Sequence, residues 1–151
     1  MKTVLALSFF LALAGSIFAA DLDSIGDWSE TLTAADLTAG AGTDLPDTLE
    51  SISAVTTLNI SNAAGPWRLK VRRAGVPWDD GVTLWVKRIS NGSGSGTIAG
   101  GSGYVAVPTS AVELFTGSEN RSNIALQFKL TGLRRNLPPR SYLSSLTFTV
   151  Q

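Results

Sequence analysis

The stretch YLSSLTFTVQ, residues 142–151, alternates between two kinds of side chain and decides the fold class of this chain. One face of the alternation holds Tyr142, Ser144, Leu146, Phe148 and Val150, and the other holds Leu143, Ser145, Thr147, Thr149 and Gln151. A period of two residues is typical of a half-buried β-strand. We therefore expect residues 142–151 to form a strand that faces the core and whose pairing edge matters.

Four other segments alternate in the same way, and turn-forming Gly, Pro, Asn and Asp residues separate them. Their apolar positions run through residues 52–60, 67–71, 82–86 and 124–130, and shorter candidates lie at 104–107 and 112–115. No ten-residue segment after the first twenty residues has a helical period, and residues Leu32–Leu37 could form at most one helical turn. This pattern favours an all-β fold, an immunoglobulin-like antiparallel β-sandwich of about seven or eight strands, over the alternative of a small barrel. The Gly/Ser-rich segment 90–103 is expected to be a flexible hairpin loop.

The first twenty residues have the organisation of a secretory signal peptide. Lys2 precedes an apolar run over residues 4–14, and small residues at 19 and 20 offer cleavage positions. The run is shorter than the roughly 20 residues that a membrane-spanning helix needs, so no membrane insertion is expected after cleavage. We therefore expect a bacterial protein that is secreted, periplasmic or located at the cell surface. Its domains are residues 1–20 as signal peptide, 21–50 as an acidic N-terminal segment, and 51–151 as the β-sandwich body.

Charge is divided unevenly along the chain. Residues 21–50 carry eight acidic side chains and no Lys or Arg, whereas residues 51–151 carry eleven basic and four acidic side chains, 11 − 4 = +7. The split suggests that the acidic segment is attracted to a basic body, its own or that of another copy. Arg68, Lys70 and Arg72 share one strand face that could contact an anionic glycan. Nucleic acid is not an expected partner, because the chain is exported and no aromatic residue is interleaved on that face.

The residue types needed for most catalytic and metal sites are missing. The chain has no His and no Cys, which excludes the usual catalytic triads, thiol chemistry and most zinc or copper sites. Asp79 and Asp80 are the only adjacent carboxylates of the body, and neighbouring residues on a turn face different directions. The acidic segment lacks a recognisable calcium-ligand spacing. We expect no enzyme activity and no cofactor.

Four tryptophans are the remaining candidates for a binding role: Trp28, Trp67, Trp78 and Trp85. Trp67 is in phase with the core positions of its strand. Trp85 points away from the apolar face of its strand, and Trp78 lies on a turn. Trp78 and Trp85 are therefore candidate ligand-binding residues, since exposed aromatic rings stack on sugars. The alternative is that a loop or a partner subunit covers Trp85.

The C-terminal residues resemble those of a known group of exported subunits. Leu137-Pro138-Pro139-Arg140-Ser141-Tyr142, followed by the alternating strand Ser145–Val150, is similar to the ending of bacterial fimbrial subunits and of the spore coat protein U family. Those proteins often close with Leu-Pro-x-Gly-x-Tyr before an alternating Thr/Val strand. Here Arg140 stands in place of the glycine, and the cysteines common in that family are absent.

The resemblance implies assembly by β-strand addition. Such subunits have incomplete immunoglobulin-like folds, in which a periplasmic chaperone strand and then the N-terminal extension of the next subunit fills a groove beside the terminal strand. The candidate donor is residues 21–33, which could equally be the domain's own first strand. The assembly residues would be Trp28, Leu32, Tyr142, Leu146, Phe148 and Val150. The leading hypothesis is an exported, non-enzymatic structural subunit of a surface fibre or coat, with copies of itself or related subunits as partners. The alternative is a monomeric secreted module that binds carbohydrate or another ligand.

Overall fold

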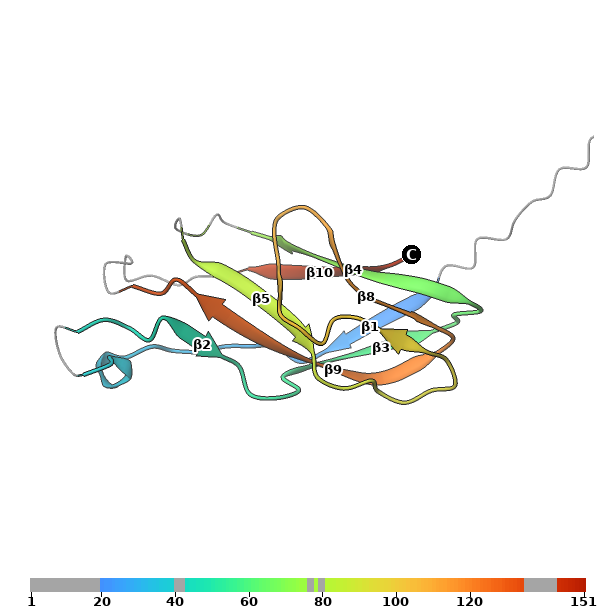
Figure 1. The fold of residues 1–151 in the computed structure, drawn as a ribbon, viewed down its shortest axis with the longest axis horizontal. Helices are drawn as coiled ribbons and strands as arrows, with labels where there is room; N and C mark the ends of the chain where they lie inside the picture. Colours follow the sequence, from blue (N-terminus) through green and yellow to red (C-terminus); the bar gives the residue numbers. More distant parts are fainter. Residues whose placement is uncertain (1–19, 40–42, 76–77, 79–80, 135–143) are drawn as a thin grey trace, which may run out of the picture.

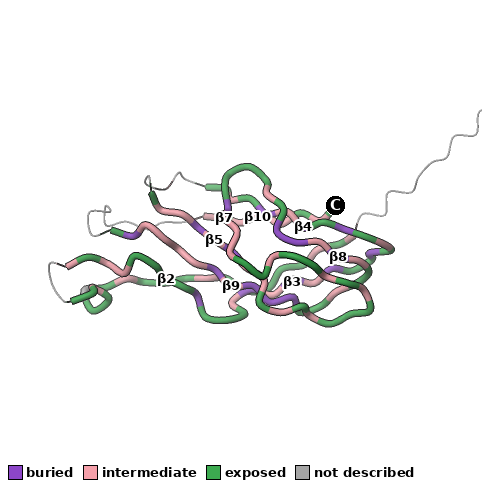
Figure 2. The backbone as a smooth tube through the Cα atoms, viewed as in Figure 1, coloured by how far each residue is buried: buried purple, intermediate pink, exposed green. Residues whose placement is uncertain are grey.

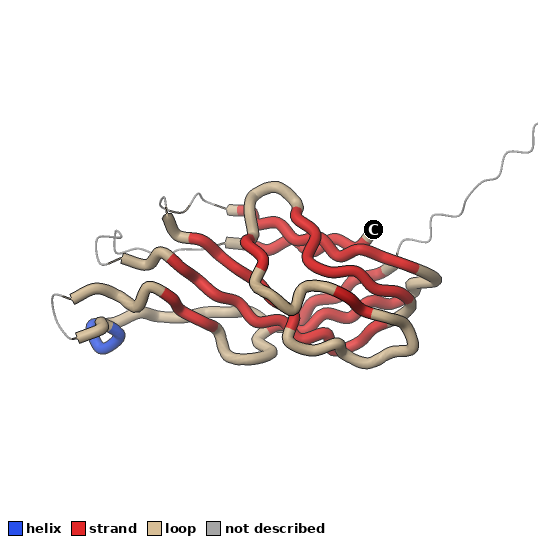
Figure 3. The backbone as a smooth tube through the Cα atoms, viewed as in Figure 1, coloured by secondary structure: helices blue, strands red, loops and turns tan. Residues whose placement is uncertain are grey.

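The fold is a sandwich of two antiparallel β-sheets, as the alternation predicts (Figures 1 and 3). It is described by a computed structural model, which covers residues 20–39, 43–75, 78, 81–134 and 144–151. The predicted signal peptide up to residue 19, the Asp79–Asp80 pair and Tyr142 lie outside these described residues. A single helical turn, η1 (Ala34–Asp36), lies at one end of the sandwich (Figure 3).

Sheet A has the strand order β1-β3-β9-β5-β7, and β2 also pairs with β9. Its strands are β1 (Asp21–Ile25), β2 (Thr48–Glu50), β3 (Thr56–Ser61), β5 (Thr83–Arg88), β7 (Val105–Ala106) and β9 (Arg121–Thr131). Sheet B has the order β10-β4-β8-β6. Its strands are β4 (Pro66–Ala74), β6 (Ile98–Ala99), β8 (Val112–Ser118) and β10 (Ser145–Val150). Three of the strands are only two or three residues long, and the other seven have five to eleven residues.

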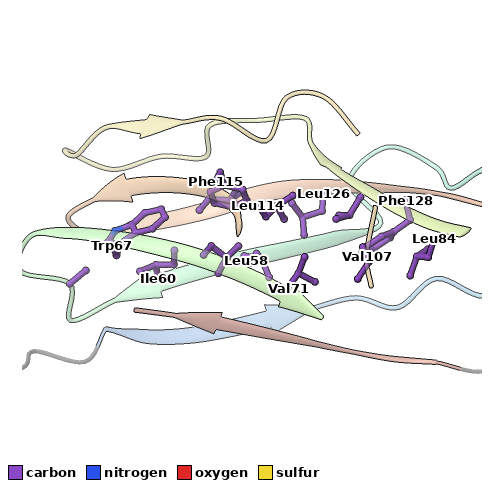
Figure 4. Packing of buried hydrophobic residues seen from close by; sticks show 14 residues of the cluster. Leu58, Ile60, Trp67, Val71, Leu84, Val107, Leu114, Phe115, Leu126 and Phe128 are labelled. Carbon is purple, nitrogen blue, oxygen red and sulfur yellow. The ribbon is translucent and has the colours of Figure 1, made fainter. Parts of the chain in front are cut away.

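The core lies between the two sheets and is built from the alternate residues of their strands (Figures 2 and 4). Leu58, Leu69, Val86 and Leu126 are fully buried there. Trp67 packs edge-to-face on Phe115 with ring centroids 6.2 Å apart, and its indole N–H donates to the Glu119 carbonyl at 2.9 Å. Because alternate side chains of each strand point to one face, the apolar phase of the sequence becomes this single layer.

The strand predicted over residues 52–60 is wrong in its first half. The strand begins at Thr56, and Ile52 is 77% exposed. Ala54 adopts a positive φ of 56°, which places the chain in a turn before β3. The predicted flexible loop over residues 90–103 contains β6, which pairs with β8, and an isolated bridge between Ser93 and Ser122. Apolar alternation alone did not distinguish these turn residues from strand residues.

The acidic segment 21–50 contributes both of its ends to sheet A. Residues 21–25 form β1 and pair with β3 of the same chain, from Asp21↔Ser61 to Ile25↔Thr57. In this structure they are therefore the domain's own first strand and not a strand donated to another copy. Between β1 and β2, Thr33 caps η1. Its Oγ1 accepts from the Ala35 N–H at 3.2 Å, and its own N–H donates to the Asp36 carboxylate at 2.6 Å. The Thr33 hydroxyl also donates to the Asp36 carboxylate at 2.9 Å, and the two bonds from the Thr33 N–H and hydroxyl lower the pKa of Asp36.

Candidate functional site

The lateral edges of the two sheets are the places where this sandwich can accept another strand. Sheet A ends in β1 and β7, and sheet B ends in β10 and β6. β1 and β10 run side by side along one flank, where their Cα atoms approach within 8 Å (Figures 1 and 4). No hydrogen-bonded ladder joins the two strands within the described residues. Two edges therefore meet at this flank, each paired on one side only.

The pairing of β10 with β4 fixes which backbone groups face outward. The register runs without a shift from Ser145↔Ala74 to Val150↔Leu69. Beyond it, the N–H groups of Arg68 and Gln151 each donate to the other residue's carbonyl, at 2.8 and 3.0 Å. Hydrogen-bonded pairs alternate along an antiparallel ladder. The N–H and C=O groups of Leu146, Phe148 and Val150 therefore point away from β4, toward the free edge.

The free edge of β10 lacks the features that usually prevent unwanted pairing. Natural edge strands are made very short, carry charges or proline, or contain a bulge. β10 has six residues, none of them charged or proline, and its register is unbroken. By contrast, β6 and β7 have two residues each, and β1 carries the exposed carboxylates of Asp21 and Asp23. Among the edges that the structure describes, β10 is the least protected.

Side chains on the inner face of β10 complete the site. Leu146, Phe148 and Val150 pack against the core and remain only partly buried. An added strand would therefore find both open backbone groups and apolar side chains at its border. Three of the predicted assembly residues lie together here. The structure does not describe Tyr142, so its predicted place beside them stays a prediction.

Trp28 and Leu32, the other predicted assembly residues, lie along their own domain. The Trp28 ring stacks on Phe128 of β9 with centroids 6.3 Å apart and planes 8° apart. Its indole nitrogen is buried without a hydrogen-bond partner among the described residues. Leu32 is half-buried. In this structure Trp28 covers the core of its own chain, so using it to assemble with another copy would require it to leave Phe128.

The two candidate ligand-binding tryptophans are held by different sheets. Trp85 lies on the outer face of sheet A, where its indole N–H donates to Thr131 Oγ1 at 2.9 Å and Lys129 lies 5.5 Å from its ring. Trp78 packs against the core, and the guanidinium of Arg73 on β4 lies 4.7 Å from its ring centroid. Each ring is partly covered by a cation of its own domain, which reduces the face available to a sugar.

A stack of Lys87, Tyr104 and Lys129 beside Trp85 was not anticipated from the sequence. The Nζ atoms of Lys129 and Lys87 lie 4.0 and 4.4 Å from the Tyr104 ring centroid. Burial of the phenol, together with the nearby Glu50 carboxylate, raises the pKa of Tyr104 to about 12. The three residues come from distant parts of the chain, and the pairing of β5 with β7 on one side and with β9 on the other brings them together. No local sequence signal predicts such a pairing.

Comparisons with known proteins and two searches of the described residues complete the picture. A scan of protein-family models, a search of curated proteins and a search of solved structures find no match to this chain. Within the described residues, no group of three or more Asp, Glu, His or Cys could hold a metal ion. The same residues include no helix long and apolar enough to cross a membrane.

Proposed function

We propose that this chain is an exported, non-enzymatic structural subunit of a surface fibre or coat, an immunoglobulin-like sandwich that assembles by β-strand addition. The observation that carries the proposal is the free edge of β10, a regular and uncharged strand of six residues. A strand added there would hydrogen-bond to the backbones of Leu146, Phe148 and Val150. The export signal and the resemblance of residues 137–150 to fimbrial and spore coat subunits support the same conclusion.

Residues 21–33 of another copy are the proposed occupant of this edge. In its own domain β1 is held mainly by its ladder with β3, because four of its five side chains are exposed and Leu22 alone is half-buried. Its outward carboxylates, Asp21 and Asp23, would lie on the outer face of sheet B, the same face as the basic row of β4. Because β10 separates the added strand from β4, these opposite charges attract each other only weakly, over roughly 10 Å, and form no direct cross-strand pair.

The geometry of this pairing decides the shape of the assembly. Pairing of residues 21–33 with β10 of the next copy is a head-to-tail contact, and contacts of this kind continue into filaments unless the rotation closes a ring. Pairing of two β10 strands would instead form a closed dimer with two-fold symmetry. A chaperone strand that occupies β10 before assembly is a further proposed partner, since an open apolar edge promotes aggregation.

The test compares assembly of residues 20–151 with that of two variants at Leu146. Leu146→Pro removes one N–H from the free edge and leaves the ladder with β4 intact, because proline is tolerated at strand edges. Leu146→Ala removes more of the Leu146 side chain's contact with the core than Leu146→Pro does, but it keeps the backbone N–H. It therefore serves as the control. We expect wild type and Leu146→Ala to form polymers in size-exclusion chromatography and electron microscopy, and Leu146→Pro to stay monomeric. A wild-type chain that remains monomeric at every concentration would contradict the proposal.

A further inference from the structure

The outer face of sheet B carries a row of cations on β4, one strand away from the free edge of β10. Arg68, Lys70 and Arg72 occupy alternate positions of β4, opposite the buried Trp67, Leu69 and Val71. Alternate residues of a strand lie about 6.8 Å apart, so the three charges form a regular row.

Hydroxyl-bearing side chains border this row on both sides. Thr147 and Thr149 of β10 pair with Arg72 and Lys70, and Thr116 of β8 pairs with Arg68. A shallow, open hollow of about 670 Å³ lies over β4, β8 and β6 next to this row. Its lining includes Arg68, Thr97, Thr116, Ser118 and Gln151. The face therefore combines cations with hydroxyl groups on an open surface and not in a closed cavity.

The positive charge of this face is only partly balanced by the protein. The ion pair found here among the described residues joins Arg68 to Glu113, with Nη1 and Oε2 3.4 Å apart and both side chains largely exposed. This pair shows that the face accommodates a carboxylate beside the guanidinium of Arg68. Lys70 lies across from the same Glu113 in the β4–β8 register, so three cations of the row share one carboxylate of the described residues, and the ion pair within 4 Å joins it to Arg68.

We propose that the outer face of sheet B binds a linear polysaccharide that carries carboxylate groups. The row of Arg68, Lys70 and Arg72 would pair with successive carboxylates, and the bordering Thr and Ser hydroxyls would hydrogen-bond to sugar hydroxyls. An open hollow fits a polymer that passes across it, whereas a small ligand is usually enclosed. The outward positions of β4, β6, β8 and β10 carry no aromatic ring for stacking bases, which disfavours single-stranded nucleic acid.

The test measures binding of polygalacturonate by the Leu146→Pro variant, so that polymer formation does not interfere with the measurement. Lys70→Gln/Arg72→Gln removes two charges from the proposed site. Lys87→Gln/Lys129→Gln removes two charges from sheet A and is the matched control. We expect the first pair to weaken binding about tenfold, since two exposed charge contacts together contribute about 1.4 kcal/mol, and the control to change it less than about twofold. Neutral dextran should not bind, and added salt should weaken the binding of polygalacturonate.

Three results would overturn this inference. Equal weakening by both double variants would show that net charge, and not this face, attracts the polymer. Tighter binding of dextran sulfate or of a single-stranded DNA oligonucleotide would show that the ligand class is wrong. Unchanged polygalacturonate binding in Lys70→Gln/Arg72→Gln, with loss of polymer formation when the same pair is placed in the wild-type chain, would assign the row to the acidic segment of another copy. Because binding is measured on a variant that does not assemble, its outcome is separate from that of the proposed function.

Discussion

β1 and β10 lie side by side on one flank of the sandwich, but their outward residues have opposite chemistry. β1 places Asp21 and Asp23 on its exposed face and buries little more than part of Leu22. β10 exposes threonine on that face and packs Leu146, Phe148 and Val150 against the core. A charged edge resists pairing with a further strand, whereas an uncharged and regular edge invites it. The flank therefore joins a strand with a charged, exposed outer face to a strand with an uncharged and regular free edge.

The largest expected effect is on the free energy of unfolding, because β10 packs more apolar side chain against the core than β1 does. Phe148→Ala removes a large ring from the core side of β10 and should lower the free energy of unfolding by about 2–3 kcal/mol, because the ring is only partly buried. Leu22→Ala on β1 should cost about 1 kcal/mol, since β1 buries less apolar surface. Urea denaturation followed by tryptophan fluorescence measures both changes, with Thr149→Ala on the outer face as control. Equal losses for the two variants would mean that β1 is held as firmly as β10.

A smaller effect is expected when the two edges are made alike. Asp21→Thr/Asp23→Thr gives β1 the neutral, threonine-bearing face of β10 and should change stability by less than about 1 kcal/mol, because both carboxylates are exposed. The loss includes the hydrogen bond from Asn62 to Asp21 at 2.6 Å. Light scattering should show faster but less ordered association, as β1 edges also begin to pair. The matched exchange to Asn at both positions removes the charge and keeps a side chain of similar size, and it should behave in the same way. Unchanged association in both variants would show that the charge of β1 does not protect its edge.

The sequence was sufficient to predict the core but not the edges. Alternation of apolar residues depends on local geometry, so Trp67, Leu69 and Val71, and likewise Leu126 and Phe128, are buried where the period places them. The same rule failed at Ile52, because a turn with a positive φ at Ala54 interrupts an alternating run.

The identity of the edge strands could not be predicted, because sheet order depends on pairings between distant residues. The alternating period of residues 142–151 identified a strand, but its single partner β4 lies more than 70 residues earlier in the chain. Trp28 was predicted to be an assembly residue from its place in the N-terminal segment. Its stacking on Phe128 follows from the tertiary path of residues 26–30, which local periodicity does not encode.

The smallest expected effect concerns β7, a third edge, whose two residues follow Tyr104 directly. Burial of the Tyr104 phenol and the nearby Glu50 carboxylate raise its pKa to about 12, above the ordinary value of about 10. Because the folded-state pKa is the higher one, the resulting stability is present below pH 10 and is lost as pH rises toward 12. Absorbance at 295 nm should show a late phenolate step in the native protein that Tyr104→Phe removes. The same variant should keep its stability at pH 7 within about 1 kcal/mol, since the hydroxyl has no hydrogen-bond partner among the described residues. A native protein in which every phenol titrates near pH 10, with no later step, would contradict this prediction and would show that the Tyr104 hydroxyl beside β7 is open to solvent.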